Sequence, residues 1–106
     1  MKTFEQKNVY ITGGSSGIGL TTAKMLAAEG ANVIIFSRSR DRLDQAAREI
    51  EGQRKSEGQR VVAMQLDVSR HEDVNRVMAE AVEQFGIPDL LINSAGIVEP
   101  GVFSEL

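Results

Sequence analysis

The chain has 106 residues and a formal net charge of −3 at pH 7, a size and charge that fit one soluble globular domain and give no basic surface for nucleic acid. It has no cysteine and one histidine, which excludes disulfides, zinc–thiolate clusters and a thiol nucleophile and argues against a histidine-based metal site. No apolar run is long enough to span a membrane, and the first residues lack the apolar core of a signal peptide, so we expect a cytoplasmic protein without a membrane segment.

Short apolar runs alternate with helical patterns along the whole chain. Strands are predicted over 8–12, 31–36, 60–66 and 90–92, and helices over 18–29, over 41–54, and after a Ser-x-x-Glu capping box at 69–72. Such alternation requires parallel strands joined by right-handed crossovers. The predicted fold class is therefore α/β, a Rossmann-type doubly wound parallel sheet in the order β-α-β-α-β-α-β, with strand order 3-2-1-4.

Three local features accompany these elements. In the first helix, Ile18 and Leu26 are expected to face the sheet together with small residues between them. Ser39 is a plausible N-cap of the second helix. The polar stretch 52–59, which contains two glycines, is predicted to be a surface loop whose charges are solvated.

A glycine-rich turn separates the first predicted strand from the first predicted helix. Gly13 allows a sharp turn, Gly17 lets backbone N–H groups approach an anion, and Gly19 allows the helix to lie close to the strand. A P-loop is excluded because Leu20 stands where lysine is required. A turn without a ligand is the alternative. The predicted binding residues are Gly13, Ser15, Ser16, Gly17, Ile18 and Gly19, the serines as hydroxyl donors.

The ends of the second and third strands supply further candidates. An NAD-selective site has an acidic residue near the end of the second strand, and this chain has Ser37 and Arg38 there. A guanidinium can bind a 2′-phosphate, which a carboxylate would repel. We therefore predict NADP(H) rather than NAD(H), held by Arg38 with Arg42 as a second contact. The alternative is that both arginines are exposed to solvent or paired with nearby aspartates.

Asp67 and Val68 follow the third strand. The carboxylate of Asp67 can accept a hydrogen bond from the adenine amino group, and Val68 can cover the edge of the ring. Alternatively, Asp67 helps to cap the next helix, although Ser69 is the better candidate for that task.

The turn, with Thr12 before it, reads Thr-Gly-x-x-x-Gly-x-Gly and resembles the signature of the short-chain dehydrogenase/reductase family. Residues 93–96 resemble the family pattern Asn-Asn-Ala-Gly, from which Ser94 departs. The resemblance covers residues 8–96. It implies that Asp67 and Val68 bind adenine, that Asn93 ties its strand to a neighbour, and that Asn93, Ala95 and Gly96 lie beside the nicotinamide ribose.

Family members use a Tyr-x-x-x-Lys pair and an upstream serine for catalysis. The only tyrosine here is Tyr10, within the first strand, with Gly14 four residues later, so we assign no catalytic and no metal-binding residue. The resemblance implies that residues 1–106 are the amino-terminal, dinucleotide-binding part of a longer domain, incomplete relative to the family fold.

The implied protein is an NADP(H)-dependent oxidoreductase that interconverts a small-molecule ketone and a secondary alcohol and forms a homo-oligomer. The polar stretch 52–59 and Ser94 resemble the 3-ketodihydrosphingosine (3-dehydrosphinganine) reductase branch. Two alternatives remain. One is a stand-alone dinucleotide-binding or sensing module without catalysis, and the other is a flavodoxin-like or receiver-like interaction domain whose glycines are only structural.

Overall fold

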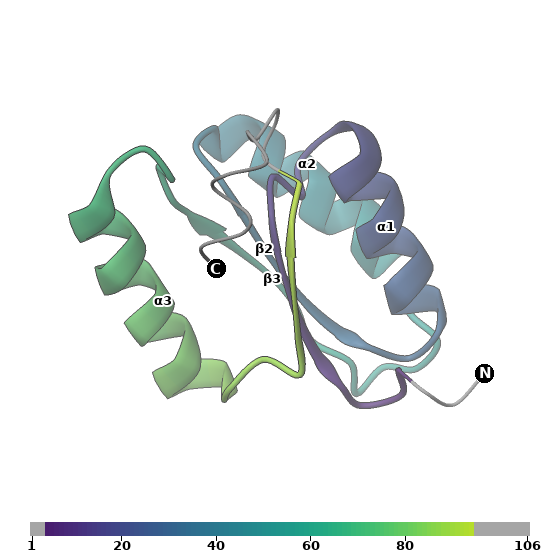
Figure 1. Cartoon of the computed structure of the whole chain (residues 1–106). Helices are drawn as coiled ribbons and strands as arrows, with labels where there is room; N and C mark the ends of the chain where they lie inside the picture. The colour runs from purple at the N-terminus through teal and green to yellow at the C-terminus, as the bar shows by residue number, and fades with distance from the viewer. Residues whose placement is uncertain (1–3, 95–106) are drawn as a thin grey trace.

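Strands and helices alternate strictly along the chain in the computed structural model, which describes residues 4–94 (Figure 1). All seven predicted elements are present, with boundaries shifted by a few residues. The second helix, for example, ends at Glu51 because the following residues form turns. The elements are β1 Asn8–Thr12, α1 Gly17–Ala28, β2 Asn32–Ser37, α2 Arg40–Glu51, β3 Val61–Gln65, α3 His71–Phe85 and β4 Leu90–Asn93.

The four strands form one parallel sheet in the order β3-β2-β1-β4, which confirms the predicted topology. In the centre of the register, Tyr10 of β1 lies between Ile34 of β2 and Leu91 of β4. Because the strands are parallel, their carboxyl ends share one edge of the sheet. The residues that follow Thr12, Ser37 and Asn93 are thereby brought to the same side of the molecule.

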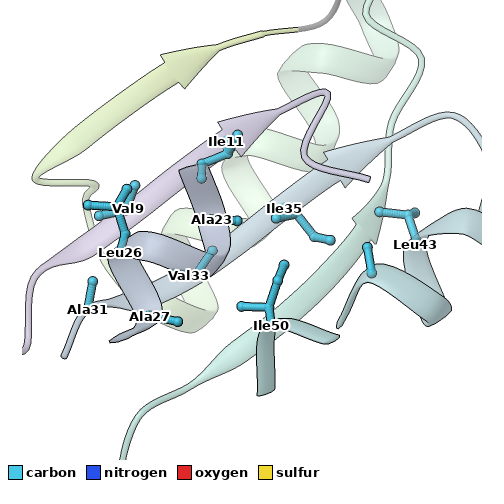
Figure 2. Close-up of a cluster of buried hydrophobic side chains, with 11 residues drawn as sticks. Val9, Ile11, Ala23, Leu26, Ala27, Ala31, Val33, Ile35, Leu43 and Ile50 are labelled. Carbon is cyan, nitrogen blue, oxygen red and sulfur yellow. The ribbon is translucent and has the colours of Figure 1, made fainter. Parts of the chain in front are cut away.

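Two apolar clusters hold the helices on opposite faces of this sheet. Helices α1 and α2 cover one face and α3 covers the other (Figure 1). The central strands are buried on both faces, which explains why they are apolar without alternation. Figure 2 shows the first cluster: Val9, Ile11, Ala23, Leu26, Ala27, Ala31, Val33, Ile35, Leu43, Ala46 and Ile50. The second consists of Tyr10, Ile34, Phe36, Leu66, Val77 and Ala81.

The first turn of α1 differs from the expectation. Ile18 was expected to face the sheet, but its side chain is 81% exposed. Gly19 is the residue that faces the sheet in this turn, followed by Ala23 and Leu26. These three residues share one helical face, and Ile18 precedes Gly19 by one residue, so it is rotated by about 100° away from that face. Ile18 therefore lies at the open amino-terminal end of α1.

A buried glutamine anchors the polar stretch between α2 and β3. The side-chain amide of Gln59 donates to the carbonyl oxygens of Ala27 and Ala31, both at 2.8 Å. Its side-chain oxygen accepts from the backbone N–H groups of Lys55 and Ser56, at 2.7 and 2.8 Å. The lysine ammonium forms an ion pair with Glu5. The charged residues of 52–59 are exposed to solvent as predicted, and Lys55 in addition forms this ion pair at the surface.

Replacing Gln59 with alanine is expected to lower the free energy of unfolding by about 2–4 kcal/mol, because two buried carbonyl oxygens and two partly buried N–H groups lose their partner. Urea denaturation followed by circular dichroism measures the loss. The exposed Gln53→Ala is the matched control, for which we expect a change below about 0.5 kcal/mol. Equal effects of the two substitutions would contradict the anchoring role of Gln59.

None of the helices within residues 4–94 is long and apolar enough to cross a membrane.

Candidate functional site

The glycine-rich turn has the geometry that its sequence predicts. Gly13 and Gly17 have φ values of 75° and 57°, in the left-handed region that side chains disfavour. The N–H group of Gly13 donates to the carbonyl oxygen of Phe36 at 2.8 Å, which ties the turn to β2. A Cβ atom on Gly19 would lie 2.3 Å from the carbonyl oxygen of Gly13, so α1 can approach the turn only with glycine at this position.

Gly14 is a further constrained position that the sequence reasoning did not assign. A Cβ atom there would lie 2.5 Å from Cγ2 of Ile35 on β2. Two adjacent glycines in the sequence indicate a constrained backbone. The sequence does not show why Gly14 is constrained, because its contact is with Ile35, which is distant in the sequence.

The amino-terminal end of α1 carries no compensating negative group. Its N-cap, Ser16, makes no side-chain capping hydrogen bond, and the first turn contains no acidic residue. By contrast, α2 is capped by Ser39 and has Asp41 in its first turn, and α3 has Glu72 and Asp73. Among the three helices of the described region, α1 alone lacks both a side-chain cap and a first-turn carboxylate. Its first N–H groups and the positive end of its dipole are therefore suited to an anion.

Ser15 and Ser16 have different surroundings. The hydroxyl group of Ser15 donates to the hydroxyl oxygen of Ser37 at 2.9 Å, and that oxygen also accepts from the N–H group of Ser39 at 3.4 Å. Ser16 is exposed at the start of α1. The structure thus places Ser15 against the end of β2 and leaves Ser16 facing solvent beside the first N–H groups of the helix.

Two exposed arginines flank the end of β2. Arg38 follows the strand directly, and its carbonyl oxygen accepts from the side-chain amide of Gln65 at 2.9 Å. Arg42 lies in the first turn of α2, where its N–H group donates to Ser39, which confirms the predicted N-cap. Asp44 pairs with Arg40 at 3.6 Å. Neither Arg38 nor Arg42 forms an ion pair with another residue of the described range, so both guanidinium groups are exposed and available.

Asp67 lies in the loop after β3 and accepts hydrogen bonds from within that loop. Oδ1 of Asp67 accepts from the N–H group of Ser69 at 3.0 Å and from its hydroxyl group at 2.6 Å. These two bonds hold the pKa of Asp67 below its usual value, and the positive charges of Arg38 and Arg70 act in the same direction. The carboxylate thus lies within the electrostatic reach of Arg38, while Val68 beside it is 52% exposed.

The predicted capping box at 69–72 is wrong. The N-cap of α3 is Arg70, which makes no side-chain capping bond. The hydroxyl group of Ser69 turns back to Asp67 instead of capping the helix. Asp73 of the first turn accepts from the N–H group of Asp67 at 2.8 Å.

The end of β4 meets the glycine turn. The hydroxyl group of Thr12 donates to Oδ1 of Asn93 at 2.9 Å, which confirms that Asn93 ties β4 to its neighbour. Ser94 donates to the carbonyl oxygen of Thr12 twice, from its N–H group at 3.0 Å and from its hydroxyl group at 2.8 Å. The sequence reasoning gave Ser94 no contact of its own. Ala95 and Gly96 lie outside the described residues.

Tyr10 takes no part in this site. Its side chain is buried under α3, and its hydroxyl group donates to the carbonyl oxygen of Gly86, which precedes β4 at the amino-terminal edge of the sheet. Burial raises the pKa of Tyr10. Residues 4–94 also contain no cluster of three or more histidine, aspartate or glutamate side chains that could hold a metal ion.

The residues that the structure brings together thus form an open helix amino-terminus with a glycine turn, a basic group at the end of β2, and a carboxylate after β3. Residues 7–106 match the short chain dehydrogenase family. The chain belongs to the short-chain dehydrogenase/reductase family. The alternative of a flavodoxin-like or receiver-like domain is therefore excluded, and the glycine turn belongs to a dinucleotide-binding fold.

Several curated relatives cover nearly all of this chain. The 3-ketodihydrosphingosine reductase of Bos taurus is 38% identical over 100 residues, which are 93% of this chain and 30% of the relative. A 3-oxoacyl-(acyl-carrier-protein) reductase of Staphylococcus epidermidis is 35% identical over 101 residues, which are 94% of this chain and 40% of the relative. The chain thus spans between about a quarter and two fifths of the first few relatives.

Solved structures of the family show the same fold. L-sorbose reductase from Gluconobacter frateurii, complexed with NADPH and L-sorbose, is 38% identical with a TM-score of 0.81 over 93% of this chain and 37% of its own. An NAD+-bound xylitol dehydrogenase is 30% identical with a TM-score of 0.77 over 85% of this chain and 33% of its own. The chain corresponds to the amino-terminal, NAD(P)-binding region of these oxidoreductases.

Proposed function

We propose that this chain is the NADP(H)-binding part of an oxidoreductase that interconverts a ketone and a secondary alcohol. The observation that carries the choice of NADP(H) is the exposed Arg38 at the end of β2, in a segment that has no acidic residue of the kind found there in NAD-selective sites. Similarity alone does not make this choice, since one related structure contains NADPH and another NAD+.

Residues suited to each part of such a cofactor are present at the carboxyl edge of the sheet. The uncapped first turn of α1, with Ser16, Gly17, Ile18 and Gly19, suits the diphosphate. Arg38 and Arg42 suit the 2′-phosphate, while Asp67 and Val68 suit the adenine. Asn93, Ala95 and Gly96 are proposed to lie beside the nicotinamide ribose. The bound nicotinamide would supply the hydride, and this chain would bind and orient the cofactor.

The extent of the domain and the substrate are also proposals. We propose that residues 1–106 are the amino-terminal part of a longer dinucleotide-binding domain, because relatives are two to four times longer. The catalytic tyrosine and lysine would then come from outside this chain. A keto-lipid of the 3-ketodihydrosphingosine type is the proposed substrate, supported by 38% identity to the bovine reductase.

Titration of the chain with NADPH and with NADH by calorimetry tests the cofactor assignment. We expect tighter binding of NADPH, and we expect Arg38→Ala to weaken NADPH binding about 10- to 100-fold, since a charge-assisted hydrogen bond contributes about 1.5–3 kcal/mol. NADH binding should not change. The control is Arg48→Ala, an exposed arginine in the last turn of α2. Equal affinity of the wild-type chain for both cofactors would overturn the choice of NADP(H).

We also propose that residues 1–106, when isolated, associate with one another through the edge of the sheet. Within the described range, β4 pairs with β1 only, and Leu90 and Leu91 are 38% and 58% exposed. An unpaired apolar edge strand favours association. Sedimentation velocity should therefore show a sedimentation coefficient that rises with the concentration of this chain, and Leu91→Asp should reduce the rise. One monomeric species over a hundredfold range of about 1–100 μM would contradict association.

A further inference from the structure

Ser94 connects the end of β4 to the glycine turn across the sheet. Its hydroxyl group donates to the carbonyl oxygen of Thr12 at 2.8 Å and lies 3.5 Å from that of Gly13. These carbonyl groups stand where β1 ends and the turn begins. The contact joins residues 82 positions apart in the sequence, so it exists only once β4 has paired with β1.

The same hydroxyl oxygen also lies against α1. A Cβ atom on Gly19 would be 2.4 Å from Oγ of Ser94 and 2.3 Å from the carbonyl oxygen of Gly13. Three segments therefore meet at one point: the end of β1, the first turn of α1 and the end of β4. Close packing of this kind limits how far the turn can rotate.

Hydrogen bonds hold the turn to the neighbouring strands on two sides. On the side of β2, the N–H group of Gly13 donates to the carbonyl oxygen of Phe36 at 2.8 Å. On the side of β4, Ser94 donates to the carbonyl oxygen of Thr12 through both its N–H and its hydroxyl group, and the hydroxyl group of Thr12 donates to Asn93. The first amide groups of α1 follow this turn directly. The direction in which they point therefore depends on the hydrogen bonds to both strands.

We propose that Ser94 is a positioning residue for the diphosphate of the cofactor, an inference that rests on the proposed function. Its hydroxyl group holds the peptide units of Thr12 and Gly13 and thereby orients the amide groups at the start of α1 before the cofactor binds. Without the hydroxyl group, the N–H group of Ser94 and the bond from the Thr12 side chain to Asn93 remain on that side, and both of these bonds involve Thr12 rather than Gly13. The turn then has to be ordered by the cofactor, which lowers the affinity.

The effect should be the same for both nicotinamide cofactors, since NADPH and NADH share the diphosphate. Loss of one neutral hydrogen bond predicts that Ser94→Ala weakens binding of each about fivefold. Hydrogen exchange of the backbone amides of residues 13–17 should be faster in the cofactor-free variant. This pattern differs from that of Arg38→Ala, which should affect NADPH alone.

The test compares the wild-type chain, Ser94→Ala, Ser94→Thr and Ser56→Ala by titration with NADPH and NADH, at a temperature below the unfolding midpoint of every variant. Ser94→Thr keeps the hydroxyl group and should retain affinity, and Ser56→Ala is the matched control at an exposed position in the 52–59 loop. Unchanged affinity in Ser94→Ala, or a loss for one cofactor only, would overturn the positioning role. Failure of the wild-type chain to bind either cofactor would overturn the proposed function itself.

Discussion

Replacing Gly19 with alanine is expected to weaken the binding of NADPH and NADH by more than about tenfold and to lower the free energy of unfolding by about 1–3 kcal/mol. The added Cβ atom would lie 2.3 Å from the carbonyl oxygen of Gly13 and 2.4 Å from Oγ of Ser94. Because the first contact is with backbone, no side-chain rotation can relieve it. Either α1 moves away from the turn or the turn rotates, and both displace the amide groups that we propose to face the cofactor.

Calorimetric titration and urea denaturation of the same preparation measure both parts of this result. The matched control is Gly58→Ala, because a Cβ atom there meets nothing within 4 Å and φ lies outside the left-handed region. That control should bind both cofactors like the wild-type chain. Gly17→Ala measures the effect of backbone strain without a steric clash, because a Cβ atom at Gly17 meets no other atom but φ is 57°. If Gly19→Ala matched the wild type in affinity and stability, the close approach of α1 would be unimportant.

The fold could be predicted from the sequence because its signals are local. Apolar runs such as Val33 to Phe36 are buried on both faces of a parallel sheet, and glycine ends the helix before β2. Alternation of such units leaves few topologies. The exposure of Ile18 could not be predicted, because the first few residues of a helix do not show which of its faces packs against the sheet. Here the contact of Gly19 with the turn decides which face that is.

The site could be predicted only in part. The sharp turn at Gly13, the close approach at Gly19 and the link through Asn93 follow from backbone rules and from the family pattern. The contacts of Ser15 with Ser37 and of Ser94 with Thr12 could not be predicted, because they join residues 22 and 82 positions apart. A serine on its own does not indicate which distant backbone or hydroxyl group it will meet.

One of these long-range contacts makes a charge reversal at the end of β2 feasible. Oγ of Ser37 accepts from the hydroxyl group of Ser15 and from the N–H group of Ser39. An aspartate side chain at this position would also accept hydrogen bonds. In Ser37→Asp both donors therefore keep an acceptor, and the fold should be unchanged. It places a carboxylate beside Arg38, where NAD-selective sites have an acidic residue.

Ser37→Asp is expected to reverse the cofactor preference. NADPH binding should weaken by about a hundredfold, since the carboxylate repels the 2′-phosphate and neutralises Arg38, and like charges placed together cost several kcal/mol. NADH binding should become about three- to tenfold tighter, because the carboxylate can accept hydrogen bonds from the ribose hydroxyl groups. Titration of both cofactors against the wild-type chain measures the two changes separately.

The uncharged Ser37→Asn is the matched control, because it has nearly the shape of aspartate and retains an acceptor oxygen. If charge near the 2′-phosphate decides the preference, Ser37→Asn should lose far less NADPH affinity than Ser37→Asp and should gain none for NADH. The difference between the two variants should shrink as salt is added, since the end of β2 is open to solvent at Arg38. Equal losses in both variants would assign the effect to shape. The 2′-phosphate would then lie elsewhere, and Arg38 would have no part in selecting the cofactor.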